Sequence, residues 1–320
     1  MTVVRPELGA TREARGGGES PYGRPVIKEP VWTWEIPFYF YTGGLAGASA
    51  GLAYVARLTG NSALARRAWL AALGGVSLSP LFLISDLGKP VRFFNMLRVF
   101  KVTSPMSVGS WILAGSGATT GVSALNAWTG LFPRTAAVSR PVAAALGLPL
   151  STYTAALVAN TAVPAWHEAR YELPFVFGAS AAASAGAAAA AVTPARDAAP
   201  ARRLLVGGAL VEVALTQVME RRLGPLGSTY SEGPAGKFGK AAKALNLAGA
   251  VVAAAAGHRN RAAAVAGSAL VSAGALCARW SVFKAGSQSA ANPDHTVVPQ
   301  RDRIERGRAP GSARGVAGGR

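Results

Sequence analysis

The sequence predicts an all-α integral membrane protein, a bundle of about eight transmembrane helices with a short interfacial helix between spans two and three. Half of the 320 residues are hydrophobic, although the formal net charge is +18. Lys and Arg collect between apolar stretches of about 20 residues, enough to cross a hydrocarbon core of about 30 Å. A nucleic-acid groove would need these cations on a soluble surface with interleaved aromatic residues, so we expect no nucleic-acid partner.

The chain divides into a transmembrane domain between two polar tails. Residues 1–31 are rich in Gly, Pro, Arg and Glu and lack an apolar core, so we expect a flexible tail and no secretory signal peptide. Residues 32–281 form the predicted transmembrane domain, and residues 282–320 form a polar C-terminal tail. The predicted spans are 36–56, 68–87, 106–128, 142–165, 173–193, 203–221, 239–257 and 261–281.

The first span carries no charge from Ile36 to Ala56. Gly43, Gly47 and Gly51 recur at every fourth position, so one face is bare and another helix is expected to approach it closely. An aromatic belt is expected where the span begins. Its residues are Trp32, Trp34, Tyr39 and Tyr41.

The seam between spans two and three, residues 85–111, is dense in polar and basic residues. Gly88 and Pro90 end the second span, because Gly tolerates a left-handed cap and Pro cannot continue a helix. Ser104 is the expected N-cap of the third span, with Pro105 at its first position. Apolar residues at helical spacing predict the short interfacial helix: Phe93, Met96, Leu97 and Phe100. Basic residues lie around them, either to dock a partner or only to orient the protein: Lys89, Arg92, Arg98 and Lys101.

The fourth span offers a polar stripe. Tyr153, Asn160 and His167 are spaced by seven, which predicts that they share one helix face. A phenol, an amide and an imidazole supply the hydrogen-bond donors and proton-exchanging groups that a quinone headgroup requires. The alternative for Tyr153 and Asn160 is hydrogen bonding between helices.

Carboxylates lie near the same membrane face and deep within span six. Glu35 opens span one, where it either serves the site or stabilises the helix N-terminus. Asp86 closes span two, as a proton relay or as a local partner of Lys89, and Glu168 closes span four. Glu212 lies in the middle of span six, where an ionisable side chain is costly and therefore a candidate for a proton path. Its alternative is a protonated carboxyl bonded to a neighbouring helix.

Cysteine and histidine usage predicts that the chain binds no haem and no metal. Cys277 is the only cysteine, so there is no disulfide, no cysteine motif for an iron–sulfur cluster and no c-type haem attachment. His258 and His295 fall in a connection and a tail, which leaves His167 without a second histidine for a haem anchor.

Charge also predicts the orientation. With eight spans both termini lie on one side, and most Lys and Arg residues fall in the tails and connections of that side. The positive-inside rule then places both termini in the cytoplasm and the chain in the cell membrane as a multi-pass protein.

Four stretches together resemble the NrfD, or polysulfide reductase membrane-subunit, family. They are WTWEIPFYFYTGGLAGASAGL, SDLGKPVRFFNMLRVFKVTSPMSVGSW, STYTAALVANTAVPAWHEARYELPFVF and RWSVFKAGSQSAANPDHTVVPQR. The resemblance implies a haem-free, eight-helix subunit that binds a quinone, menaquinone or ubiquinone, and passes electrons to or from a docked iron–sulfur subunit. That subunit would serve a molybdenum or tungsten catalytic subunit of the oxidoreductase.

The resemblance also implies roles for single residues. Glu35, Tyr39 and Tyr153 correspond to the family's quinone pocket, although relatives can carry a histidine at the position of Tyr39. Asn160 shares the predicted stripe with Tyr153, and we expect it to bind the quinone as well. The expected proton relay comprises Asp86, His167, Glu168 and Glu212. The expected docking residues are Lys89, Arg92, Arg98 and Lys101. Two other functions stay open: a proton-coupled transporter or proton channel without redox chemistry, and a passive anchor that binds no quinone.

Overall fold

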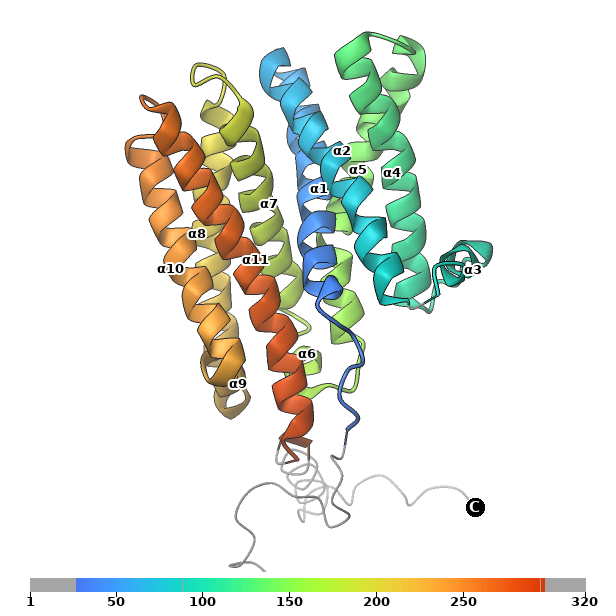
Figure 1. The fold of residues 1–320 in the computed structure, drawn as a ribbon, viewed down its shortest axis with the longest axis vertical. Coiled ribbons are helices and arrows are strands. Elements are labelled where there is room, and N and C mark those ends of the chain that lie inside the picture. The colour runs from blue at the N-terminus through green and yellow to red at the C-terminus, as the bar shows by residue number, and fades with distance from the viewer. Residues whose placement is uncertain (1–26, 88, 294, 297–320) are drawn as a thin grey trace, which may run out of the picture.

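The computed structural model describes residues 27–296 except 88 and 294. Within these residues the secondary structure is entirely helical, and the long helices run alternately up and down in one bundle (Figure 1). The long helices are α1 Glu35–Leu58, α2 Ser62–Asp86, α4 Pro105–Thr129, α5 Pro133–Ala159, α7 Leu173–Val192, α8 Ala199–Arg222, α10 Gly233–Ala255 and α11 Arg261–Ala291. The short helices are α3 Arg92–Arg98, α6 Pro164–Glu168, the 3₁₀ turn η1 Gly224–Gly227 and α9 Ser228–Ser231.

Each predicted span overlaps one long helix of the described residues. Four of these helices, α2, α5, α7 and α11, are long and apolar enough to cross a membrane. Eight membrane crossings therefore stay a prediction. Residues 1–26 and 297–320, which make up most of the two predicted tails, lie outside the described residues, as does Gly88.

The largest differences from the predicted bounds are in α5 and α11. Helix α5 begins at Pro133 and ends at Ala159, whereas the prediction placed the span at 142–165. The chain leaves the helix at Asn160 because Pro164 follows shortly and disfavours helical geometry in the residue before it. Helix α11 continues to Ala291, so the first residues of the predicted tail at 282–320 are helical, with Val282 and Phe283 buried.

The long C-terminal helix is held by the segment around α6. The Trp166 indole N–H donates to the carbonyl oxygen of Val282 at 2.7 Å. Its ring lies against Gly286, where a Cβ would overlap the ring. The hydroxyl of Ser289 accepts the backbone N–H of Ala165 at 3.2 Å. These contacts explain why residues 282–291, which look polar in the sequence, remain helical and pack against the segment around α6.

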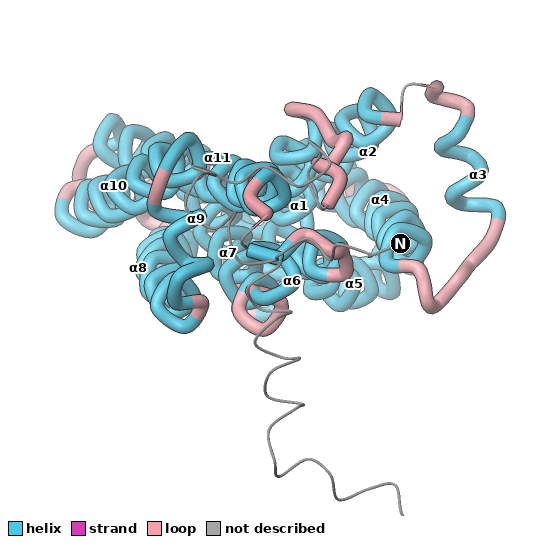
Figure 2. Tube along the Cα trace, turned by 90° about the horizontal axis from the view of Figure 1, so that it is seen from below, coloured by secondary structure: helices cyan, strands magenta, loops and turns pink. Residues whose placement is uncertain are grey.

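The bundle consists of two groups of four helices, seen end-on in Figure 2. Helices α1, α2, α4 and α5 pack together in the first group, and α7, α8, α10 and α11 in the second. Helices α1 and α7 lie at the contact between the groups. The predicted close approach is confirmed at Gly47, where a Cβ would clash with the carbonyl oxygen of Gly147 on α5, whereas Gly51 faces open space.

The seam folds largely as the sequence predicts. Ser104 caps α4 by accepting the Ser107 backbone N–H at 3.4 Å, and Pro105 is the first residue of the helix. Helix α3 forms at the predicted place and lies at the edge of the bundle beside α4 (Figure 2). None of its residues is buried. Its position at a membrane interface stays a prediction.

Candidate functional site

A cavity lies among α1, α2, α3, α4 and α5, at the end of the bundle where α1 begins. It holds about 490 Å³ of empty space and is open to the outside. We call it the Tyr39–Tyr153 cavity. Its polar lining is Tyr39, Asp86, Ser110 and Tyr153. Its apolar lining includes Trp32, Phe40, Leu83, Met96, Met106 and Leu157.

The two tyrosines approach the cavity from different helices. Tyr39 on α1 is 2% exposed, and Tyr153 on α5 is half-buried. The Tyr153 ring lies directly on the backbone of α4 at Gly109, where a Cβ would overlap the ring. Neither hydroxyl makes a hydrogen bond with a described residue, so both can donate to a ligand in the cavity.

Two carboxylates meet at the rim of this cavity through Thr33. Asp86 accepts the Thr33 backbone N–H at 3.2 Å and the Thr33 hydroxyl at 3.0 Å. The same hydroxyl also contacts the Glu35 carboxylate. Thr33 therefore connects Glu35 to Asp86, and Asp86 also lines the cavity.

Other sequence-predicted residues do not join them. Asn160 is the exposed C-cap of α5, and His167 is exposed on α6 with its Nδ1 3.2 Å from the carbonyl oxygen of Ala159. Glu168 forms an exposed ion pair with Arg170 at 3.7 Å. The predicted stripe of Tyr153, Asn160 and His167 was wrong, because the helix that would align them ends at Ala159.

The basic residues of the seam surround the cavity without lining it. Lys89, Arg92, Arg98 and Lys101 are all exposed, on α3 or the turns beside it. No ion pair joins Asp86 to Lys89 in the described residues, so Asp86 instead pairs with Thr33. Met96 of α3 lines the cavity, so the four basic residues lie on or beside the helix that forms one of its walls.

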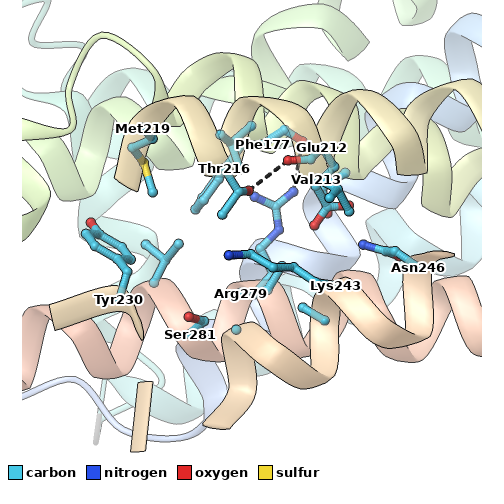
Figure 3. Close-up of a pocket in the computed structure, with 16 residues that line it drawn as sticks. Phe177, Glu212, Val213, Thr216, Met219, Tyr230, Lys243, Asn246, Arg279 and Ser281 are labelled. Atoms are coloured by element: carbon cyan, nitrogen blue, oxygen red, sulfur yellow. Dashed lines mark hydrogen bonds between the residues drawn. The ribbon is translucent and has the colours of Figure 1, made fainter. Parts of the chain in front are cut away.

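A second cavity lies in the other group of helices, among α7, α8, α10 and α11, and holds about 460 Å³ of empty space. We call it the Glu212 cavity (Figure 3). Glu212 is 2% exposed, so the sequence prediction of a buried carboxyl in span six is confirmed in its burial. Arg279 of α11 and Lys243 of the neighbouring helix α10 line the same space.

The sequence analysis missed Arg279, Lys243 and Thr33. Arg279 is 2% exposed, donates to the Phe177 carbonyl oxygen at 2.9 Å and has its guanidinium 3.7 Å from the Phe177 ring centroid. It stands next to Trp280 at the predicted end of a span, so its sequence position suggested the start of a polar tail. The sequence signal that could have found it is its position inside the predicted span 261–281, where a charged side chain is a candidate for a function.

No group of three or more His, Cys, Asp or Glu residues in the described part of the chain could hold a metal ion. Cys277 is half-buried. The donor groups that the two cavities do present are hydroxyls, carboxyls, an amide and cations. Their chemistry is hydrogen bonding and proton exchange.

A family model described as polysulfide reductase, of the NrfD type, matches residues 19–292. The chain belongs to the polysulfide reductase family. This confirms the resemblance inferred from the four sequence stretches. The family comprises membrane subunits of oxidoreductase complexes, so this polysulfide reductase-family chain is a membrane protein of that class. A search of curated proteins finds no match to it.

The family match covers every helix of the described fold. It therefore includes both cavities, the Tyr39–Tyr153 cavity and the Glu212 cavity. Membership of the polysulfide reductase family shows that the chain is a membrane subunit of an oxidoreductase complex. The residues that line each cavity determine which ligand it can bind.

Proposed function

We propose that this chain is the quinone-binding membrane subunit of a multisubunit oxidoreductase. It would exchange electrons between the quinone pool and a docked iron–sulfur subunit, which serves a molybdenum or tungsten catalytic subunit. The observation that carries the proposal is the convergence of Tyr39, Tyr153 and Asp86 on one cavity with otherwise apolar walls. Family membership supports the class of complex.

The lining residues fit a quinone. A quinone carries two electrons and two protons and presents two carbonyl oxygens on a flat apolar ring. Tyr39 and Tyr153 would donate hydrogen bonds to those oxygens. Trp32, Phe40 and Met96 provide apolar surface for the ring and its hydrocarbon tail. The menaquinone and ubiquinone headgroups would both meet the same donors.

Asp86 would exchange the proton that accompanies electron transfer. Its carboxylate lines the cavity and is held by two hydrogen bonds from Thr33. Glu35 would replenish it through the Thr33 hydroxyl, which both carboxylates contact. Asn160, His167 and Glu168 lie outside the cavity lining, so we assign the local proton exchange to Asp86 and Glu35 alone.

Docking of the iron–sulfur subunit would involve the seam. Lys89, Arg92, Arg98 and Lys101 form an exposed basic group beside the cavity, which suits an acidic partner surface. The described helices α1 and α11 respectively begin and end at the same end of the bundle as the cavity (Figure 1). We place this end, and the partners, on the cytoplasmic side of a bundle with eight membrane crossings.

Binding of a fluorescent quinone analogue to the purified complex tests the site. Tyr39→Phe and Tyr153→Phe should each weaken binding, because each removes one donor without changing the ring. Tyr171→Phe is the matched control, since Tyr171 is 63% exposed and lies outside the cavity. Unchanged binding in the Tyr39→Phe, Tyr153→Phe double variant would refute the assignment.

A proton-coupled transporter or proton channel is the second candidate, and the buried Glu212 favours it. The two functions predict different partners. A redox subunit purified in mild detergent should bring an iron–sulfur protein with the visible absorbance of its cluster. A transporter should purify alone.

A further inference from the structure

We propose that the Glu212 cavity is a proton-binding chamber that water enters from one side of the membrane only. Glu212 is its proton acceptor, and access is from the bundle end where α8 finishes. This inference concerns a site distinct from the Tyr39–Tyr153 cavity. It does not depend on whether a quinone binds there.

The chamber contains several buried polar atoms whose distances to other described groups exceed those of a hydrogen bond. In the described part of the chain, buried atoms without a hydrogen bond include both carboxyl oxygens of Glu212, Oδ1 of Asn246, Oγ of Ser180 and Nε of Arg279. All four residues line the one cavity. Leaving such groups unsatisfied is costly, and ordered water is their usual partner. The geometry therefore points to water inside the chamber.

The charges around Glu212 leave its proton free to exchange. Arg279 faces it from α11 but forms no ion pair with it within the described residues, because the guanidinium is engaged by Phe177. Lys243 of α10 pairs with Glu220 of α8 at 2.7 Å. Tyr230 of α9 uses its hydroxyl to donate to the Ala165 carbonyl oxygen at 2.9 Å. Ser180 and Asn246 are the polar neighbours of the Glu212 carboxyl, and no cation forms an ion pair with it in the described part of the chain, so Glu212 is the acceptor that we assign to the chamber.

The outlet lies at the Lys243–Glu220 ion pair. Their side chains are 27% and 18% exposed, whereas Glu212 and Arg279 are each only 2% exposed. Glu220 stands two residues before the end of α8 at Arg222. Glu212 lies about 12 Å deeper along the same helix, by the rise of 1.5 Å per residue. Thr216 lies between Glu212 and Glu220 on α8 and lines the cavity, so water that enters beside Glu220 would pass it on the way to Glu212.

Beyond Glu212 the same four helices close. We call this region the aliphatic plug. It is defined by six buried side chains, those of Ala183, Leu205, Ala209, Ala250, Ala253 and Val271. A Cβ at Gly208 would lie 2.5 Å from the backbone nitrogen of Ala183, and one at Gly249 would lie 2.7 Å from the carbonyl oxygen of Gly267. These approaches close the α7–α8 and α10–α11 contacts, and the side chains of the plug form one buried cluster from all four helices, so we end the path at Glu212.

Cysteine accessibility tests the one-sided path. In a full-length Cys277→Ser background, Thr216→Cys and Ala242→Cys line the chamber, whereas Ala209→Cys and Ala253→Cys lie in the plug. Each variant is placed in sealed vesicles and treated from either side with a membrane-impermeant methanethiosulfonate cation. We expect labelling of the two chamber positions from the side of the α8 C-terminus and no labelling of the two plug positions.

The outcomes are distinct. Labelling of a chamber position from the opposite side, or of a plug position from either side, indicates a continuous channel and overturns the proposal. Absence of labelling at both chamber positions, in variants that elute as folded monodisperse protein, indicates a closed void and also overturns it. Two chamber positions are used so that one poorly folded variant does not decide the result.

A hydrophobic carbodiimide tests the acceptor itself, because it modifies protonated carboxyls within a membrane. Peptide mass mapping of the wild-type chain should find the adduct on Glu212. Glu212→Gln should lose that adduct, and Glu220→Gln should keep it. Absence of an adduct on Glu212 at every pH tested, while another carboxyl of the chain is modified, would refute its role as acceptor.

Discussion

Each four-helix group contains one of the two cavities, and the side chains that line the two cavities differ in chemistry. The Tyr39–Tyr153 cavity has aromatic walls, free hydroxyls and a carboxylate whose hydrogen bonds are supplied at the rim by Thr33. The Glu212 cavity encloses a buried acid and a buried guanidinium. An apolar wall with few donors suits a flat lipophilic ring, whereas enclosed charges suit water and protons. One bundle can therefore hold a ligand-binding site in its first helix group and a proton-binding site in its second.

The strongest way to break this comparison is to remove the buried cation of the second cavity. Arg279→Met should lower the free energy of unfolding by about 3 kcal/mol, because it removes the hydrogen bond to the Phe177 carbonyl oxygen and the longer-range Coulombic attraction between the guanidinium and Glu212. Thermal unfolding in detergent measures the loss. Adding Glu212→Gln should restore part of the stability, which a purely packing defect would not allow.

Lys284→Met provides the matched control for that substitution. Lys284 is on the same helix and only half-buried, and its ammonium contacts the rings of Trp280 and Phe283 from outside the cavity. Its replacement should change unfolding little. An equal loss in both variants would contradict a special role for the charge of Arg279.

The first cavity is tested by its carboxylate. Asp86→Asn should reduce the quinone-linked turnover of the complex by about 100-fold, the usual contribution of a positioned proton-transfer group. Carbodiimide labelling of Glu212 should be unaffected, since the two sites are separate. Glu168→Gln is the control, because Glu168 is exposed and lies outside the cavity lining. A similar loss of turnover in Asp86→Asn and Glu168→Gln would contradict a specific role for Asp86.

The shape of the first cavity depends on Gly109. Gly109→Ala should displace the Tyr153 ring, at a cost of about 1–3 kcal/mol for overpacking, and weaken quinone-analogue binding by about tenfold. A titration of the fluorescent analogue measures this change. Gly121→Ala in the same helix should leave binding unchanged, because a Cβ there meets nothing within 4 Å.

The smallest effect is expected at the rim. Thr33→Val removes a hydroxyl that contacts both carboxylates, and the loss of about 1 kcal/mol corresponds to about a fivefold decrease in turnover. Thr33→Ser should retain the activity, since it keeps the hydroxyl. If Thr33→Val is as active as wild type, the proton exchange does not pass through this residue.

The sequence predicted the helices well because apolar length and cap residues are local signals. Ser104 with Pro105, for example, specified the start of α4 from adjacent residues alone. The convergence of Tyr39, Tyr153 and Asp86 was also anticipated, because all three lie near the same end of their helices. Their function as a quinone site stays a prediction.

The sequence failed where tertiary contacts decide. The spacing of Asn160 and His167 suggested one helix, but the chain ends α5 at Ala159 and places His167 on α6. Arg279 looked like the start of a tail because burial of a guanidinium depends on Phe177, which is distant in sequence. The length of α11 likewise depends on Trp166 packing beside it, which periodicity does not reveal.

Phe40 lines the first cavity and Phe177 lines the second, and their ring centroids are 5.8 Å apart. Two aromatic rings at this distance make a thin partition of low dielectric constant. Such a partition stops solvent and hydrogen-bond chains from crossing, but it transmits an electric field with little screening. Gain of charge in one compartment would therefore be felt in the other without any molecule having to pass between them.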